Sequence, residues 1–276
     1  MGRTAAGRNR AMTGWLLYPL LGAVAGMLAG LLGVGGGLVL VAALVWLLPL
    51  RGVPVEFAMQ AALATSLASI VLTALSSARA HARRGSVLWP TVWALLPGLL
   101  LGGWLGSLLA THLSGEILRW AVASYCFLAG AQLLLGQPRS HVNGGEDAPR
   151  DVVIGVAGLG IGAISALVGI GGGSMTVPLL IWRGVSPVRA VGTSSACGVA
   201  IGLASAAGYA LHGPAGGLPQ GSLGFVYLPA AIGIALASIL TAPLGARLAH
   251  RLSGRTLQQV FALFLLAVGA ALGLGI

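Results

Sequence analysis

The chain has 276 residues, of which 57% are hydrophobic and only 7% are charged, and its mean hydropathy is +0.95. Soluble domains carry about 25% charged residues, so this composition excludes a soluble enzyme or binding module. The net charge of +10 comes from arginines that stand between apolar runs instead of clustering on one polar face. This pattern excludes a nucleic-acid partner and makes the arginines anchors against anionic lipid. Cys126 and Cys197 lie inside apolar runs and lack the spacing of a zinc or redox pair.

Apolar runs follow one another along nearly the whole chain, and most are long enough to cross a hydrocarbon core of about 30 Å as a helix. The pattern predicts an all-α, polytopic helical membrane protein. We expect a basic tail at 1–14, a first membrane repeat at 15–136, a polar linker at 137–150 and a second membrane repeat at 151–276. The predicted apolar blocks are 15–50, 57–78, 86–111 and 117–136 in the first repeat, and 152–182, 190–212, 222–249 and 256–275 in the second.

The first block of each repeat contains the same unusual motif. Residues 26–44 read GMLAGLLGVGGGLVLVAAL, and residues 162–180 read GAISALVGIGGGSMTVPLL. Other positions recur in the same order, including Ala64-Thr65-Ser66 against Gly192-Thr193-Ser194. A duplicated hydrophobic segment that is broken by glycine is typical of transporters whose binding site lies between two repeats.

The two long first blocks, 15–50 and 152–182, exceed the thickness of the hydrocarbon core, because a helix rises about 1.5 Å per residue. Each block must therefore break. If each broken block crosses the membrane once, the chain has eight spans and two parallel repeats. If each forms a hairpin, the number of spans per half is odd and the repeats are inverted. We expect eight spans, an arrangement that divides the arginines almost evenly between the two sides and gives no orientation.

The glycine tracts are the first candidates for a substrate site. Glycine frees the backbone from helical geometry, and N–H groups at the start of a following half-helix can hold an anion. Close packing of helices through small residues is the alternative interpretation. Hydroxyl groups in the next block can donate to a substrate oxygen or bond back to their own helix. The predicted substrate-binding residues are Gly33, Gly35, Gly36, Gly37, Thr65, Ser66, Gly169, Gly171, Gly172, Gly173, Ser174, Thr193 and Ser194.

Two histidines at matching places, His81 and His212, close the second block of each half. Together with Arg79 they are candidates for a proton or anion relay. The alternative is that the histidines are interfacial residues at helix ends and that Arg79 is a lipid anchor. None of the five acids lies within an apolar core, which argues against a cation substrate and a carboxylate relay. The glycine tracts lack the Lys-Ser/Thr ending of a nucleotide-binding loop. We expect no metal site and no cofactor.

The paired segments GLLGVGGGLVLV and ALVGIGGGSMTVP, each followed by a Thr-Ser helix, resemble the sulfite exporter TauE/SafE family of membrane permeases over essentially the whole chain. The resemblance implies a multi-pass protein of the bacterial inner membrane that moves a small anion, such as sulfite or an organosulfonate, without a prosthetic group. One departure is that Pro178 follows the second motif, whereas Ala42 stands at the matching place in the first. The expected mechanism is alternating access between the repeats, with the anion, the lipid bilayer and a second copy of the chain as partners.

Other functions stay open at this level. A permease of the same architecture would carry a carboxylate or a neutral metabolite. An intramembrane serine hydrolase would use Ser174 as its nucleophile and His212 as its base, although Leu38 stands opposite Ser174 in the first repeat. A pure assembly subunit would bind no small anion.

Overall fold

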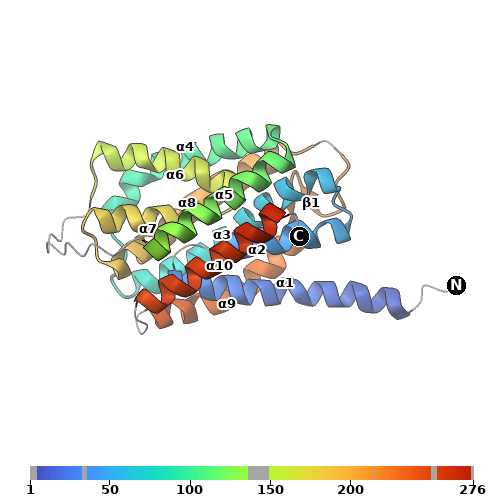
Figure 1. Cartoon of the computed structure of the whole chain (residues 1–276), viewed down its shortest axis with the longest axis horizontal. Helices are drawn as coiled ribbons and strands as arrows, with labels where there is room; N and C mark the ends of the chain where they lie inside the picture. The colour runs from blue at the N-terminus through green and yellow to red at the C-terminus, as the bar shows by residue number, and fades with distance from the viewer. Residues whose placement is uncertain (1–4, 33–35, 136–148, 215, 250–253, 275–276) are drawn as a thin grey trace.

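The computed structural model describes residues 5–32, 36–135, 149–214, 216–249 and 254–274, which form a helical bundle (Figure 1). The first half consists of α1 (Ala5–Leu32), α2 (Gly37–Leu47), α3 (Ala58–Ala82), α4 (Trp89–His112) and α5 (Gly115–Leu135), with 3-10 turns η1 (Pro49–Arg51) and η2 (Val55–Phe57). The second half consists of α6 (Val152–Val168), α7 (Gly173–Trp182), α8 (Pro187–Leu211), α9 (Leu228–Ala249) and α10 (Gly254–Leu274). A short antiparallel hairpin of β1 (Ser222–Leu223) and β2 (Val226–Tyr227) precedes α9.

The predicted all-α, polytopic membrane fold is confirmed. Among the described residues, α3, α4, α5, α8 and α9 are long and apolar enough to cross a membrane, and shorter apolar helices accompany them. α2 and α7 have only 11 and 10 residues. At about 1.5 Å per residue they reach roughly halfway through the hydrocarbon core, so they are half-helices. α1 begins at Ala5, inside the predicted tail, and most of the predicted linker lies outside the described residues.

Small residues allow helices of the two halves to approach closely. α1 packs along α9, and α6 packs along α4, so the first helix of each half lies against a helix of the other half. A Cβ on Gly22, Gly26 or Gly30 of α1 would collide with the backbone of α9. A spacing of four residues places these glycines on one helix face, a contact typical of membrane helices. The two halves are therefore interlocked.

Equivalent helices of the two halves run antiparallel. Gly202 of α8 lies against Leu67 of α3, and Gly192 of α8 lies against His81 of α3. Residue numbers therefore rise along α3 as they fall along α8. The contacts between α5 and α10 have the same antiparallel order. Because these helices occupy matching places in the sequence repeat, the two halves have opposite orientations.

This arrangement corrects the expectation of eight spans in parallel repeats, because the chain turns back at the first glycine tract. A Cβ on Gly36 would meet the backbone of Ala25, so α2 starts beside the last third of α1. After α2 the chain returns toward the middle of α1, where the Arg51 guanidinium lies 5.9 Å from the centroid of the Tyr18 ring. The first broken block is therefore a helical hairpin.

The second half closes the same hairpin with an ion pair. Arg183, just after α7, lies 3.0 Å from the carboxylate of Asp151, just before α6. This hydrogen bond from Arg183 holds the pKa of the exposed Asp151 carboxyl below its ordinary value. With both blocks folded back, each half has an odd number of helices in the described part of the chain, which is the condition for inverted repeats.

Candidate functional site

The two glycine tracts, far apart in the sequence, meet inside the bundle. A Cβ on Gly37, at the start of α2, would collide with the carbonyl oxygen of Gly169 and approach the Cα of Ile170. The hydroxyl of Ser66 on α3 lies within hydrogen-bond distance of both tracts, 3.2 Å from the Gly37 oxygen and 3.0 Å from the Gly169 oxygen. One buried serine thus joins the two breaks. Gly33 and Gly35 lie outside the described residues.

The backbone of the second tract shows how the helix is broken. Gly169 ends α6 in the left-handed conformation, with φ of 76°, and its N–H and that of Ile170 both donate to the Ser165 carbonyl. Gly172, with φ of 74°, is then the N-cap residue of α7. Only glycine adopts these angles without strain, which explains the motif. Gly36 is the N-cap residue of α2 in the same conformation, with φ of 64°.

Both half-helices therefore expose their N-terminal N–H groups near the junction. In α7 the first bonds run from Met175 and Thr176 to the Gly172 carbonyl, so the N–H groups of Gly173 and Ser174 precede the hydrogen-bonded part of the helix. The N-terminus of a helix carries the positive end of its dipole and is suited to an anion. Gly171 lies close by, because its oxygen is 3.1 Å from the place of a Cβ on Gly198 of α8.

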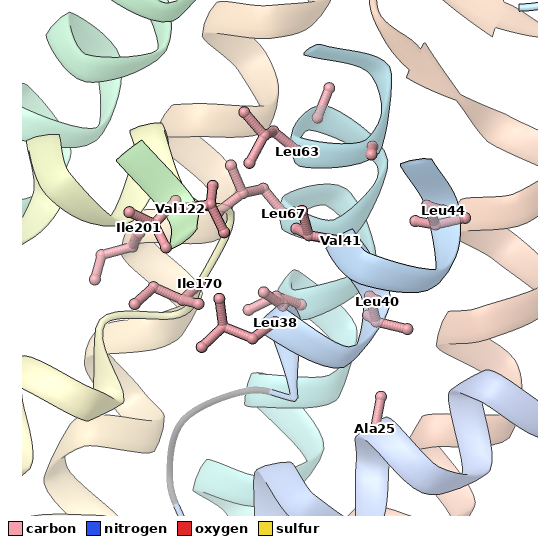
Figure 2. Packing of buried hydrophobic residues seen from close by; sticks show 14 of the residues in the cluster. Ala25, Leu38, Leu40, Val41, Leu44, Leu63, Leu67, Val122, Ile170 and Ile201 are labelled. Carbon is pink, nitrogen blue, oxygen red and sulfur yellow. The ribbon is translucent and has the colours of Figure 1, made fainter. Parts of the chain in front are cut away.

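The surroundings of the junction are buried and apolar (Figure 2). Leu38 and Val41 of α2, Leu63 of α3, Ile170 and Ile201 are all buried and belong to one hydrophobic cluster. An apolar environment strengthens the attraction between helix dipoles and an anion, because little water screens it. The arrangement is chemically able to hold a small anion by backbone N–H and hydroxyl groups.

The predicted threonines have partners that the sequence did not reveal. The Thr65 hydroxyl oxygen accepts a 3.0 Å hydrogen bond from the N–H of Tyr227, just before α9. In the mirror relation, the Thr193 oxygen accepts a 2.9 Å bond from the N–H of Leu88, just before α4. Each threonine thus joins its own half to the start of a helix in the other half. Ser194 is fully buried on α8.

The predicted relay residues are not brought together. His81 is buried at the end of α3, with Nε2 3.2 Å from the Gly30 oxygen. His212 is exposed after α8, and its Nδ1 lies 2.9 Å from the Gly208 oxygen. Because α3 and α8 are antiparallel, the two histidines lie at opposite ends of the bundle. Arg79 is exposed near the end of α3, and none of the three reaches the glycine junction.

Sequence reasoning missed two residues beside the second tract, Ser165 and Tyr125. The Ser165 hydroxyl is fully buried and lies 3.3 Å from the place of a Cβ on Gly172. The Tyr125 hydroxyl of α5 hydrogen-bonds the hydroxyl of Ser174. A comparison of the two repeats for differences instead of identities would have found Ser165, because Ala29 stands at its place in the first motif.

A cavity of about 1100 Å³ opens at the end of the bundle where α3 begins and α4 ends. Its polar lining includes Gln60, His112 and Arg119, together with two acids, Glu56 and Glu116. No described residue of the glycine tracts is among those that line this cavity. The described residues contain no cluster of histidine, cysteine or acidic side chains that would hold a metal ion.

Comparisons with known proteins agree with this architecture. The family described as "Sulfite exporter TauE/SafE" matches residues 18–272. A curated relative from Haemophilus influenzae, named a probable membrane transporter protein, is 39% identical over 254 residues. The aligned part covers 92% of this chain and 96% of the relative. No solved structure matches the chain. The family match includes both glycine tracts and therefore the whole junction.

Proposed function

This chain belongs to the sulfite exporter TauE/SafE family of membrane transporters, and on that premise we propose that it moves a small anion, sulfite or an organosulfonate. The observation that carries the proposal is the contact of Gly37 with Gly169, bridged by Ser66. It brings the breaks of two inverted halves to one buried point, which is where transporters of this kind bind their cargo.

An anion fits this point better than a cation does. The charge that the junction offers is the positive end of helix dipoles, and no acidic side chain belongs to the buried part of the described chain. Cation transporters ordinarily keep a carboxylate within the membrane. The family description names sulfite, and a pyramidal oxyanion with several acceptor oxygens matches a set of N–H and hydroxyl donors.

Transport would proceed by alternating access at the junction. The buried apolar cluster that includes Ile170 and Ile201 packs around the junction. Relative motion of the two halves would open the junction first to one side and then to the other. We place the protein in the bacterial inner membrane, in keeping with its multi-pass fold and its bacterial relative.

The hydrolase alternative has no support in the geometry. Gly171 lies beside Gly198 of α8, so Ser174 at the start of α7 lies next to the middle of α8. His212, in contrast, follows the end of α8. The fourteen residues from Gly198 to His212 span about 20 Å of helix, too far for a base to reach a nucleophile. A carboxylate or neutral cargo is the alternative that the experiment must exclude.

The test is sulfite flux into proteoliposomes that contain the purified protein, with protein-free liposomes as the control. We expect saturable flux of sulfite or an organosulfonate, with competition from the other sulfur oxyanions. A parallel thermal-shift series uses sulfite, sulfate, thiosulfate, sulfoacetate, taurine, acetate and chloride at matched ionic strength. A ligand at about 100 times its Kd stabilises the protein by about 2.7 kcal/mol, which is easily measured. Transport of acetate or a neutral solute, with no response to any sulfur anion, would refute the proposal.

A further inference from the structure

The two glycine breaks differ in their hydroxyl groups, although their motifs match. In the second half, Ser165, Ser174 and Thr176 surround the break, and Tyr125 reaches it from α5. At the matching places of the repeat stand Ala29, Leu38 and Leu40 in the first half and Phe264 on α10. Four hydroxyls at the second break thus correspond to four apolar residues at the matching places. We infer that the anion is held by the second-half break, and that Ser165 and Ser174 are its side-chain ligands.

Ser165 has the properties of an unfilled ligand position. Its side chain is fully buried, and its hydroxyl has no hydrogen-bond partner among the described residues. Buried hydroxyls are ordinarily satisfied, so an unpaired one beside a helix N-terminus indicates a place for a polar ligand. The hydroxyl lies 3.3 Å from the Cβ position of Gly172, the N-cap residue of α7. An anion at the start of α7 would accept its hydrogen bond.

Tyr125 acts through Ser174 and is a positioning residue. The two hydroxyls are hydrogen-bonded, which fixes the Ser174 side chain at the first turn of α7. When Tyr125 donates to the Ser174 oxygen, the proton of Ser174 is available for an acceptor on the anion. Phenylalanine at this place, as at 264 in the other half, keeps the ring and removes the donor.

The atoms that close each break support the same assignment. At Gly172 the neighbouring atoms are the side-chain ends of Ile201 and Ile161 and the hydroxyl of Ser165. At Gly36 they are backbone atoms of Ala25. A side-chain end can move aside by a rotamer change, whereas the backbone of a helix cannot. The second break can therefore open for a ligand, with Ile201 as the group that must move, and the first break is a fixed packing contact.

The experiment measures sulfite binding by calorimetry and sulfite flux for the wild type, Ser165→Ala and Tyr125→Phe. Each substitution installs the residue that stands at the matching place of the other half, Ala29 or Phe264, so the fold is expected to persist. Ser205→Ala is the matched control, because Ser205 is also fully buried and unpaired among the described residues but lies beside Gly103. We expect Ser165→Ala to weaken sulfite binding about tenfold or more, since a hydrogen bond to a charged ligand is lost.

Tyr125→Phe should weaken binding to a smaller extent, and Ser205→Ala should leave the Kd of the wild type unchanged. Thermal melts without ligand separate binding from folding, because Ser165→Ala removes an unpaired group and should not lower the Tm. The inference rests on the proposed function, and the two fail differently. A wild type that neither binds nor moves sulfite refutes the function. A wild type that binds sulfite, with the same Kd in Ser165→Ala and Ser205→Ala, refutes only the assignment of the ligands.

Discussion

Thr65 and Thr193 each form a hydrogen bond that connects the two halves of the protein. Each oxygen accepts the N–H of a residue that precedes a long helix of the other half, Tyr227 or Leu88. Both threonines are fully buried, so no water can replace the bond. Buried backbone N–H groups that lose their acceptor cost about 1–3 kcal/mol. These two hydroxyls therefore stabilise the contact between the inverted halves without a bound substrate.

We expect Thr65→Val and Thr193→Val each to lower the stability of the purified protein by about 1–3 kcal/mol, because valine keeps the shape and removes the acceptor. Thr91→Val is the matched control. Thr91 is also fully buried, and its hydroxyl has no partner among the described residues, so its loss should leave the Tm unchanged or raise it. Melting curves in detergent measure the difference. Equal Tm values for all three variants would show that the two bonds contribute nothing to stability.

At the residue scale the sequence marked Thr65 and Thr193 as equivalent but did not reveal their partners. Their substrate-binding role stays a prediction, and the structure shows that they accept equivalent hydrogen bonds. Their partners lie in the other half, more than a hundred residues away in the chain. No local pattern encodes such a pair, because periodicity and propensity report only on neighbours within a few turns. Ser165 was missed for a different reason, since a search for identity between repeats hides the positions that differ.

At the scale of elements, α2 can begin where it does only because its first residue is glycine. Gly37 allows the start of α2 to touch the turn at Gly169, with Ser66 bonded to the carbonyls of both. A helix N-terminus that approaches another backbone this closely cannot carry a side chain. The contact is the structural basis for treating the two breaks as one site.

We expect Gly37→Ala to abolish transport and lower stability, because its methyl group would push the start of α2 away from Gly169. Gly160→Ala on α6 is the control, since a methyl group there meets nothing within 4 Å and alanine favours a helix over glycine by about 1 kcal/mol. Sulfite flux in proteoliposomes and Tm are the readouts. Normal flux from Gly37→Ala, at expression equal to that of the control, would show that the close approach is dispensable.

The sequence predicted that each first block breaks at its glycines but not the direction of the chain beyond the break. Glycine permits both a kinked crossing and a return. The return is decided by contacts such as Gly36 against Ala25 and Arg183 with Asp151. The first of these joins two small apolar residues, which are too common in this chain to stand out. Hydropathy therefore located the long apolar blocks but did not reveal that the first block of each half folds back as a hairpin.

For the whole molecule, the inverted arrangement changes the distribution of positive charge. The beginning of α1 and the end of α10 lie at the same face of the bundle (Figure 1). The helix ends at the opposite face carry most of the described arginines: Arg79, Arg83, Arg84, Arg150, Arg183, Arg189, Arg247 and Arg255. The face with the beginning of α1 has Arg51, Arg119 and, in the first turns of α1, Arg8 and Arg10. The even split that eight parallel spans would give does not hold for this fold.

We therefore predict that the arginine-rich face is cytoplasmic and that the beginning of α1 and the end of α10 lie on the periplasmic side, because short cytoplasmic loops are enriched in arginine. Single cysteines at the two ends of α8 test this. Ser186→Cys marks the arginine-rich face, and Gly216→Cys marks the other. Cys126 and Cys197 are buried and should not react. In intact bacteria a membrane-impermeant maleimide should label only Gly216→Cys, and permeabilised cells should label both. Labelling of Ser186→Cys alone in intact cells would show that the arginine-rich face is periplasmic and that the predicted orientation is wrong.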